Sequence, residues 1–215
     1  MRGFAFIGAL AVAASLAMPA RAENLDASES ARLEAGQTIV REQTFDSSAM
    51  GYESERRLVG GLTYTLVDAT PDELMTVLED VGNWKNLLPK TKSATVVESK
   101  GLDTFVELAQ GASLATAKYT IHLRRAPRDH TVRFWLDPSR PHAIDDAWGF
   151  FRAQEAPPSK DGAPRTLLTF GILVDTGPGI VRSFYEERLR STMMGIPQVV
   201  RQYVLANVRR RAIPT

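Results

Sequence analysis

Cysteine is absent from the 215 residues of this sequence, and histidine occurs only three times, as His122, His130 and His142. Without thiols the protein forms no disulfide, no zinc–thiolate site and no iron–sulfur cluster. The three histidines lack the spacing of a metal site, and the sequence has no His-Glu-x-x-His pair, no Gly-x-Ser-x-Gly turn and no Walker loop. We therefore predict no metal, no cofactor and no catalytic motif of a known type.

The sequence also lacks an excess of charge of one sign. It has 26 basic and 25 acidic residues, and removal of residues 1–22, which hold two of the basic residues and no acidic one, leaves a net charge of −1. Nucleic-acid binding leaves a clustered basic surface, which this balance does not indicate. Nucleic acid is accordingly not expected as a partner.

Only the N-terminus carries a long apolar run. Arg2 is followed by apolar residues from Phe4 to Met18, and Ala20-Arg21-Ala22 closes the segment with small residues. This layout is typical of a cleavable signal peptide, and the run is short for a membrane span, which needs roughly 20 apolar residues. An uncleaved N-terminal anchor is the alternative. We predict a signal peptide over residues 1–22 and export to the periplasm or the medium.

The rest of the chain is predicted to hold an N-terminal extension (residues 23–50) and one domain (residues 51–211). In the extension, a short helix over Ala27–Ala35 ends at Gly36, and Gln37–Gln43 is a candidate strand. The domain begins with an alternating strand over Leu62–Asp68.

A helix start follows that strand. Thr70 can cap the helix, Pro71 suits its first turn, and Glu73 completes a capping box. Apolar residues then recur at helical spacing until Gly82, and Asn83–Leu88 forms a second short helix before Pro89. Two short helices are therefore expected after the first strand.

Six strand-like segments come next, separated by turn residues. They are Ser93–Ser99, Thr104–Leu108, Lys118–Arg125, Thr131–Leu136, Ala147–Gln154 and Thr166–Val174. Links this short join antiparallel neighbours, because parallel strands need a crossover of about a dozen residues. An antiparallel meander is expected.

The last segment, Gly179–Arg211, has an apolar stripe at helical spacing. Pro197 interrupts it and should kink or divide the helix, because proline supplies no amide hydrogen. One long amphipathic helix can cover seven strands only if the sheet curls around it. We therefore predict an α+β fold in which a curved seven-stranded antiparallel sheet wraps around a long C-terminal helix.

This order resembles the helix-grip fold of the START-like (SRPBCC) superfamily, which includes polyketide cyclases and coenzyme-Q-binding carriers. The resemblance covers about residues 58–208. It rests on the run from Val67 to Leu74, on Val77-Leu78-Glu79-Asp80 with Trp84 and Pro89, and on Trp148-Gly149-Phe150 with the strand from Thr166. Many members carry tryptophan in the first helix, where this chain has Met75. The resemblance implies a cavity between sheet and helix that binds an apolar small molecule.

Alternation along the strands, the apolar stripe of the C-terminal helix and the Trp84 motif predict which residues line that cavity. They are Trp84, Phe105, Glu107, Tyr119, Ile121, Phe134, Trp148, Phe150, Arg152, Phe170, Phe184 and Met193. Aromatic stripes more often fill a solid core, so an interaction domain with a filled core stays open as an alternative.

Two charges in this set, Glu107 and Arg152, are predicted to point inward and orient a ligand headgroup, although Val106 and Leu108 compete with Glu107 for the inner face. Placement at the rim of the sheet is the alternative for both. An enzyme of the cyclase or aromatase type would need an inward acid or base, and Glu107 and Tyr119 are the candidates. Arg209, Arg210 and Arg211 suit a helix C-terminus or a transient contact with anionic lipid. A non-catalytic carrier of an apolar molecule is the favoured function.

Overall fold

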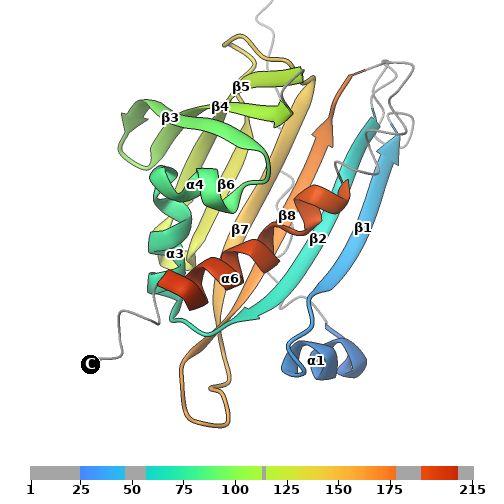
Figure 1. The fold of residues 1–215 in the computed structure, drawn as a ribbon, viewed down its shortest axis with the longest axis vertical. Coiled ribbons are helices and arrows are strands. Elements are labelled where there is room, and N and C mark those ends of the chain that lie inside the picture. The colour runs from blue at the N-terminus through green and yellow to red at the C-terminus, as the bar shows by residue number, and fades with distance from the viewer. Residues whose placement is uncertain (1–24, 47–56, 113–114, 178–189, 208–215) are drawn as a thin grey trace, which may run out of the picture.

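The computed structural model describes residues 25–46, 57–112, 115–177 and 190–207 (Figure 1). The strands are β1 Ile39–Asp46, β2 Arg57–Val67, β3 Thr91–Lys100, β4 Asp103–Ala112, β5 Ala115–Ala126, β6 Thr131–Leu136, β7 Asp146–Ala156 and β8 Arg165–Asp175. The helices are α1 Ala27–Glu34, α3 Pro71–Glu79, α4 Trp84–Leu87 and α6 Ile196–Asn207, with short 3₁₀ turns η1 Val81–Asn83 and η2 Pro127–Asp129. The predicted signal peptide and the predicted boundary at residue 51 lie outside the described residues.

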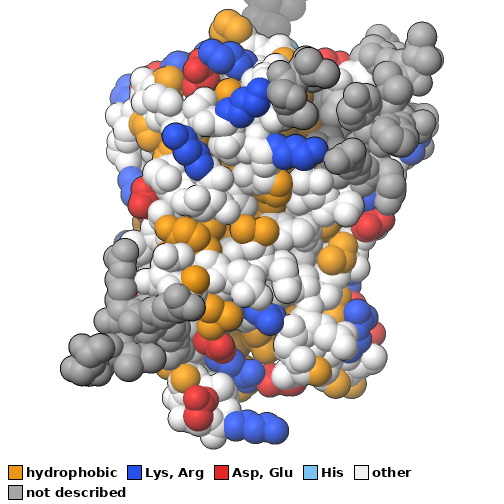
Figure 2. Space-filling view, in the orientation of Figure 1, with side chains coloured by type: hydrophobic (Ala, Val, Ile, Leu, Met, Phe, Trp, Pro, Cys, Tyr) orange, Lys and Arg blue, Asp and Glu red, His pale blue; other side chains and the backbone are white. Residues whose placement is uncertain are grey.

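All eight strands form one antiparallel sheet in the order β1-β2-β8-β7-β6-β5-β4-β3. Helices α3, α4 and α6 lie on one face of it (Figure 1), and the edge strand β3 contacts both α4 and η1. The same side in space-filling view shows hydrophobic side chains reaching the surface across its middle (Figure 2). The α+β class, the antiparallel meander and the covering C-terminal helix are confirmed.

The predicted number of strands, seven, is wrong. The eighth strand is β1, which comes from the predicted N-terminal extension and pairs with β2 from Ile39 opposite Tyr64 to Asp46 opposite Arg57. Without β1, the backbone amides and carbonyls along that edge of β2 would lack partners in the sheet. Helix α1 packs against β1 and β2 at this edge of the sheet through Leu33, which belongs to one buried cluster with Ile39 and Tyr64.

The C-terminal helix is divided where proline predicted a break. Residues 190–194 are helical, Gly195 forms a turn, and α6 begins at Ile196 with Pro197 as its second residue. Proline is accommodated there because the first turn of a helix has no use for its amide hydrogen. The buried side chains Val200 and Val204 hold α6 against the core.

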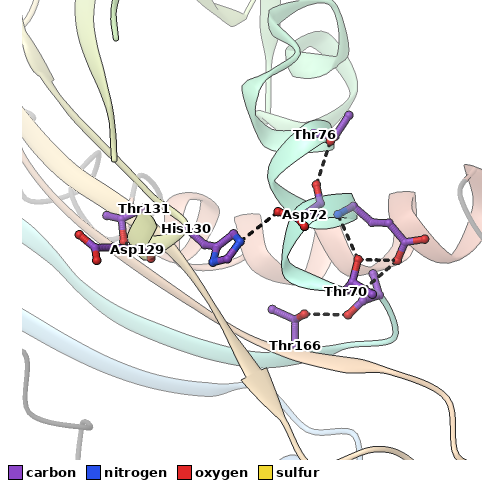
Figure 3. A network of polar contacts seen from close by, with 9 residues as sticks. Thr70, Asp72, Thr76, Asp129, His130, Thr131 and Thr166 are labelled. Atoms are coloured by element: carbon purple, nitrogen blue, oxygen red, sulfur yellow. Dashed lines mark hydrogen bonds and ion pairs between the residues drawn. The ribbon is translucent and has the colours of Figure 1, made fainter. Parts of the chain in front are cut away.

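Helix α3 begins as predicted and is tied to the sheet at that point (Figure 3). The Thr70 hydroxyl accepts from the Glu73 amide at 3.3 Å, and the Glu73 carboxylate accepts from the Thr70 amide at 2.8 Å. The Thr166 hydroxyl of β8 donates to the Ala69 carbonyl at 2.7 Å, and His130 Nε2 lies 3.0 Å from the Asp72 carboxylate. These bonds fix where α3 crosses the sheet.

The inner face of the sheet, which the helices cover, is built from every second residue of each strand. Val106 and Leu108 of β4, Ile121 and Leu123 of β5, Val132 and Phe134 of β6, and Leu168 and Phe170 of β8 belong to one buried cluster with α3, α4 and α6. The predicted inward alternation is therefore right for β5, β6 and β8.

The predicted alternation is wrong for β7 and β4. On β7, Phe151 and Ala153 face the core, while Trp148 is 40% exposed. Gly149 faces inward because the Phe134 ring lies over it: a Cβ there would come within 2.5 Å of Phe134 Cζ. Bulky residues occupy both alternations of this strand, and the close approach of Phe134 places the glycine inside.

Candidate ligand pocket

A pocket of about 360 Å³ lies between the helices that follow β2 and the inner face of β3 to β6. Half of its twelve lining residues are apolar, three are charged, two are small and polar, and one is glycine. They are Leu78, Glu79, Asp80, Val81, Gly82, Trp84, Val96, Ser99, Thr104, Leu123, Arg125 and Val132. The volume falls within the range of small-molecule sites, about 300–1,000 Å³.

The helical wall of the pocket exists because the chain turns sharply after α3. Asp80 leaves the helical conformation, and its carboxylate accepts from the Gly82 amide at 2.9 Å, which starts η1. The Trp84 indole then donates to the Leu78 carbonyl at 2.9 Å, so α4 folds back against the end of α3. This reversal sets Leu78 and Trp84 side by side along the pocket.

The sheet wall combines buried and exposed side chains. Leu123 of β5 and Val132 of β6 are buried and form the apolar floor. Val96 of β3 lines the same pocket but is 46% exposed, so it stands at the mouth. The pocket thus runs from the hydrophobic core to the β3–β4 hairpin.

Charge in the pocket is concentrated in three side chains. Arg125 Nη1 lies 3.3 Å from the Glu79 carboxylate, and Arg125 Nη2 donates to the Gly101 carbonyl at 3.0 Å. Asp80 is exposed. The guanidinium therefore links α3 to the turn of the β3–β4 hairpin, next to an apolar floor. Within the described ranges, no three His, Asp or Glu side chains are grouped so as to hold a metal ion.

Trp84 alone among the predicted ligand-binding residues lines this pocket. Five others lie in the hydrophobic core between the sheet and the helices and do not line the pocket. They are Tyr119, Ile121, Phe134, Phe170 and Met193. Phe184 lies outside the described residues. The remaining five are on the outer face of the sheet: Phe105, Glu107, Trp148, Phe150 and Arg152.

Glu107 and Arg152 do not form the predicted inward pair. Val106 and Leu108 hold the inner positions of β4, so Glu107 faces out, where its carboxylate lies 3.8 Å from Lys118 Nζ. Arg152 alternates with the inward Phe151 and places its guanidinium 5.5 Å from the centre of the Phe150 ring. The outward placement follows from the apolar side chains that occupy the inner positions beside them.

Phe105 also faces outward, in a stack of three rings. Its ring lies 4.2 Å from that of His122, which lies 4.2 Å from that of Trp135. The Asp103 carboxylate lies 2.7 Å from His122 Nε2. Phe105 therefore belongs to a packed surface cluster.

Tyr119 faces inward at the other end of β5. Its hydroxyl donates to the Gln110 side-chain carbonyl, and the Gln110 amide donates to the Thr91 hydroxyl at 2.8 Å. Burial raises the pKa of the Tyr119 phenol well above its ordinary value. Tyr119 is thus a neutral hydrogen-bonding group at physiological pH and a poor general base.

The prediction from the sequence included none of the five polar side chains of the pocket, namely Glu79, Asp80, Ser99, Thr104 and Arg125. Alternation from Leu123 does place Arg125 on the inner face, and that signal was available. The contribution of α3 depended on the chain reversal at Asp80, which no local pattern predicts. Gln110 and Thr91 were missed as well, although Gln110 follows Leu108 by two residues.

No protein-family model matches the sequence, and no curated protein matches it. Solved structures do. The chain is similar to a STAR-related lipid transfer protein from Xanthomonas axonopodis (TM-score 0.57, 16% identity, covering 78% of this chain and 92% of that one). It is also similar to the Zhui aromatase/cyclase from Streptomyces sp. R1128 (TM-score 0.55, 16% identity, 82% and 97%). A START superfamily protein from Mycobacterium smegmatis gives a TM-score of 0.54 at 11% identity, with 69% and 97% covered.

These neighbours are START/SRPBCC-type proteins, and the fold of this chain is of the same type. The predicted resemblance is therefore confirmed. Identities of 11–16% carry the likeness no further than the fold.

Proposed function

We propose that this protein is an exported carrier that binds an apolar small molecule, such as a lipid or isoprenoid, in the pocket between α3, α4 and the sheet. The observation that carries the proposal is the pocket of about 360 Å³ with Leu78, Trp84 and Val132 in its walls. Each buried methylene group of a ligand gains roughly 0.8 kcal/mol, so an apolar tail can bind there with little polar recognition.

The fold supports the same proposal. One structural neighbour is described as a lipid transfer protein and another as an aromatase/cyclase, and both names refer to small organic molecules. A carrier is favoured over a cyclase because Glu107 faces the solvent and Tyr119 does not line the pocket. Neither residue suits proton transfer from a bound substrate.

Export is proposed from the N-terminal sequence. Arg2, the apolar run from Phe4 and the Ala20-Arg21-Ala22 segment form a signal-peptide layout. Within the described part of the chain, no helix is both long and apolar enough to cross a membrane. An apolar molecule needs a protein carrier in an aqueous compartment, which the periplasm would be.

Tryptophan fluorescence tests the pocket directly, because the sequence has only three tryptophans. Trp84 lines the pocket, while Trp135 and Trp148 belong to the outer face. In a W135F/W148F variant, a brominated fatty acid is expected to quench Trp84 in a saturable manner. Mass spectrometry of the purified protein then identifies the natural ligand.

The matched control is a W84F/W135F variant, in which Trp148 is the only tryptophan. Trp148 should be quenched no more than free tryptophan at the same quencher concentration. Equal quenching in the two variants, or none in either, would contradict ligand binding at this pocket. Turnover of a polyketide-type substrate by the purified protein would favour the cyclase alternative.

A further inference from the structure

Exposed aliphatic side chains gather on the β3–β4 hairpin. Five large hydrophobic side chains of the described residues are exposed by 40% or more, and three of them, Val96, Val97 and Leu102, belong to this hairpin. The other two, Val40 on β1 and Trp148 on β7, stand apart from each other and from the hairpin. Single exposed hydrophobic side chains scattered over a surface are normal, whereas several on one hairpin indicate a contact surface.

The backbone of β3 contributes to this cluster. Val96 pairs with Val106, but the next pair joins Glu98 to Phe105, so Val97 is an extra residue without a partner on β4. Such a bulge interrupts the alternation of side chains and turns the strand edge. As a result two consecutive valines are exposed, at 46% and 43%, and Val96 is also in the pocket wall.

The turn of the hairpin brings a leucine and a lysine to its tip. Leu102, 48% exposed, follows Gly101 in the turn between β3 and β4, and Lys100 precedes it. Arg125 holds this turn against the pocket mouth by its bond to the Gly101 carbonyl. Val96 belongs both to the exposed aliphatic residues and to the pocket lining, so the two adjoin. The hairpin itself lies at the sheet edge beside α3 and α4 (Figure 1).

The acidic groups of the hairpin are paired with neighbouring side chains, and Arg140 is shared between Glu98 and Asp137. Glu98 lies 2.6 Å from Arg140 Nη2, and Asp103 contacts both His122 and Arg124. Lys100, in contrast, is exposed and has no ion-pair partner among the described residues. The surface thus presents aliphatic side chains with an available cation beside them, which complements the phosphate of a lipid headgroup.

We infer that residues 96–102 dock onto the surface of a lipid bilayer, with Val96, Val97 and Leu102 entering the acyl boundary and Lys100 at the phosphate level. A bilayer suits this surface better than a folded protein partner does, because a stable protein interface buries about 800 Å² on each side and centres on aromatic anchors. Three exposed aliphatic side chains on one hairpin are sufficient for a shallow, reversible contact with lipid. The inference rests on the proposed function, since docking would place the pocket mouth against the source of an apolar ligand.

Flotation with vesicles tests this docking. The purified protein is mixed with vesicles of phosphatidylcholine containing phosphatidylglycerol, and the bound fraction gives a partition coefficient. Leu102→Asp and Val97→Asp should each lower that coefficient about tenfold, because burial of one such side chain changes an equilibrium by that order. Lys100→Glu should lower it in the anionic vesicles and leave binding to pure phosphatidylcholine nearly unchanged.

Val40→Asp is the matched control, since Val40 is 44% exposed on the opposite edge strand and Val97 is 43% exposed. It should leave the partition coefficient unchanged. Equal losses for Val40→Asp and Val97→Asp, or absence of wild-type binding, would overturn the inference. So would self-association of the wild-type protein that Leu102→Asp abolishes.

Vesicle binding and ligand binding in the pocket can be measured separately. Quenching of Trp84 by a brominated fatty acid supplied from solution needs no bilayer, so it should persist in Leu102→Asp. Normal quenching without vesicle binding would remove the docking inference and leave the proposed function intact. Vesicle binding without quenching of Trp84 would contradict the proposed function and leave the docking inference intact.

Discussion

The two faces of the sheet are stabilised by different interactions, although they alternate along the same strands. On the inner face, Val106, Phe134 and Phe170 lie among apolar neighbours from α3, α4 and α6. On the outer face, α1 covers one part, where Tyr64 is buried, and elsewhere side chains pair with one another near solvent, as in the stack of Phe105, His122 and Trp135. Apolar character alone therefore does not assign a residue to a face, because the outer face also contains aromatic rings.

The largest expected effect comes from an inner aromatic residue. Phe134→Ala should destabilise the protein by about 3–5 kcal/mol, because it removes a buried ring at the centre of the core. Trp148→Ala, on the exposed side of the next strand, should cost less than about 1 kcal/mol. Urea denaturation measures both. Similar losses for the two variants would contradict the observed alternation of β7.

Gly149 on the inner face and Gly171 on the outer face allow a second test of the difference between the two faces. An alanine Cβ at Gly149 would lie 2.2 Å from the Gly171 carbonyl oxygen, a backbone atom that cannot move freely. At Gly171 the nearest atoms belong to the Phe150 and Leu62 side chains, which can shift. We expect Gly149→Ala to cost about 3 kcal/mol and Gly171→Ala about 1 kcal/mol in unfolding free energy. The reverse order would refute this packing.

An outer-face carboxylate provides a pH-dependent term. Hydrogen bonds from Ser139 and then Arg140 hold the pKa of Asp137 below its usual value. A lowered pKa stabilises the fold above the unfolded pKa of about 3.9, and this stabilisation is lost as the pH falls through the folded value. Asp137→Asn should therefore cost about 1.5 kcal/mol at pH 7 and progressively less below about pH 4. A pH-independent difference in thermal unfolding would contradict it.

The smallest effect is expected at Glu107. Its carboxylate is half exposed and lies 3.8 Å from an exposed Lys118, and such pairs contribute about 0–1 kcal/mol. Glu107→Gln should leave both the unfolding midpoint and the quenching of Trp84 by a brominated fatty acid within experimental error of the wild type. A loss of ligand affinity would show that Glu107 reaches the ligand after all.

Much of the fold was predictable because its signals are local. The capping box at Thr70, the break at Pro197 and the short links between strands each depend on neighbouring residues. The alternation of β5, β6 and β8 was predictable too, since in each strand the apolar residues outnumber the polar ones on one side only. The strand of Ala147 to Gln154 offered bulky apolar residues in both alternations, and there the sequence pattern was ambiguous.

The candidate site was far less predictable. Only Trp84 of the predicted residues lines the pocket, because the prediction assumed that the largest aromatic side chains surround a ligand. In the folded protein Phe134 and Phe170 fill the core next to α6, whereas Phe105, Trp148 and Phe150 lie on the outer face of the sheet. The pocket lies where Asp80 and Gly82 turn the chain after α3. The position of that turn relative to β3–β6 depends on contacts between residues distant in the sequence.

Local signals in the sequence were enough for the class of fold, for the antiparallel meander and for the starts of α1 and α3, because hydrogen bonding and side-chain periodicity act over a few residues. Only the tertiary structure decided which face of β7 is buried, that β1 completes the sheet, and where space remains for a ligand. These features depend on how side chains from separate segments fit together, as the Phe134 ring over Gly149 illustrates. Because the interior is closely packed, assigning one aromatic ring to the wrong face of the sheet changes both the predicted core and the predicted pocket lining.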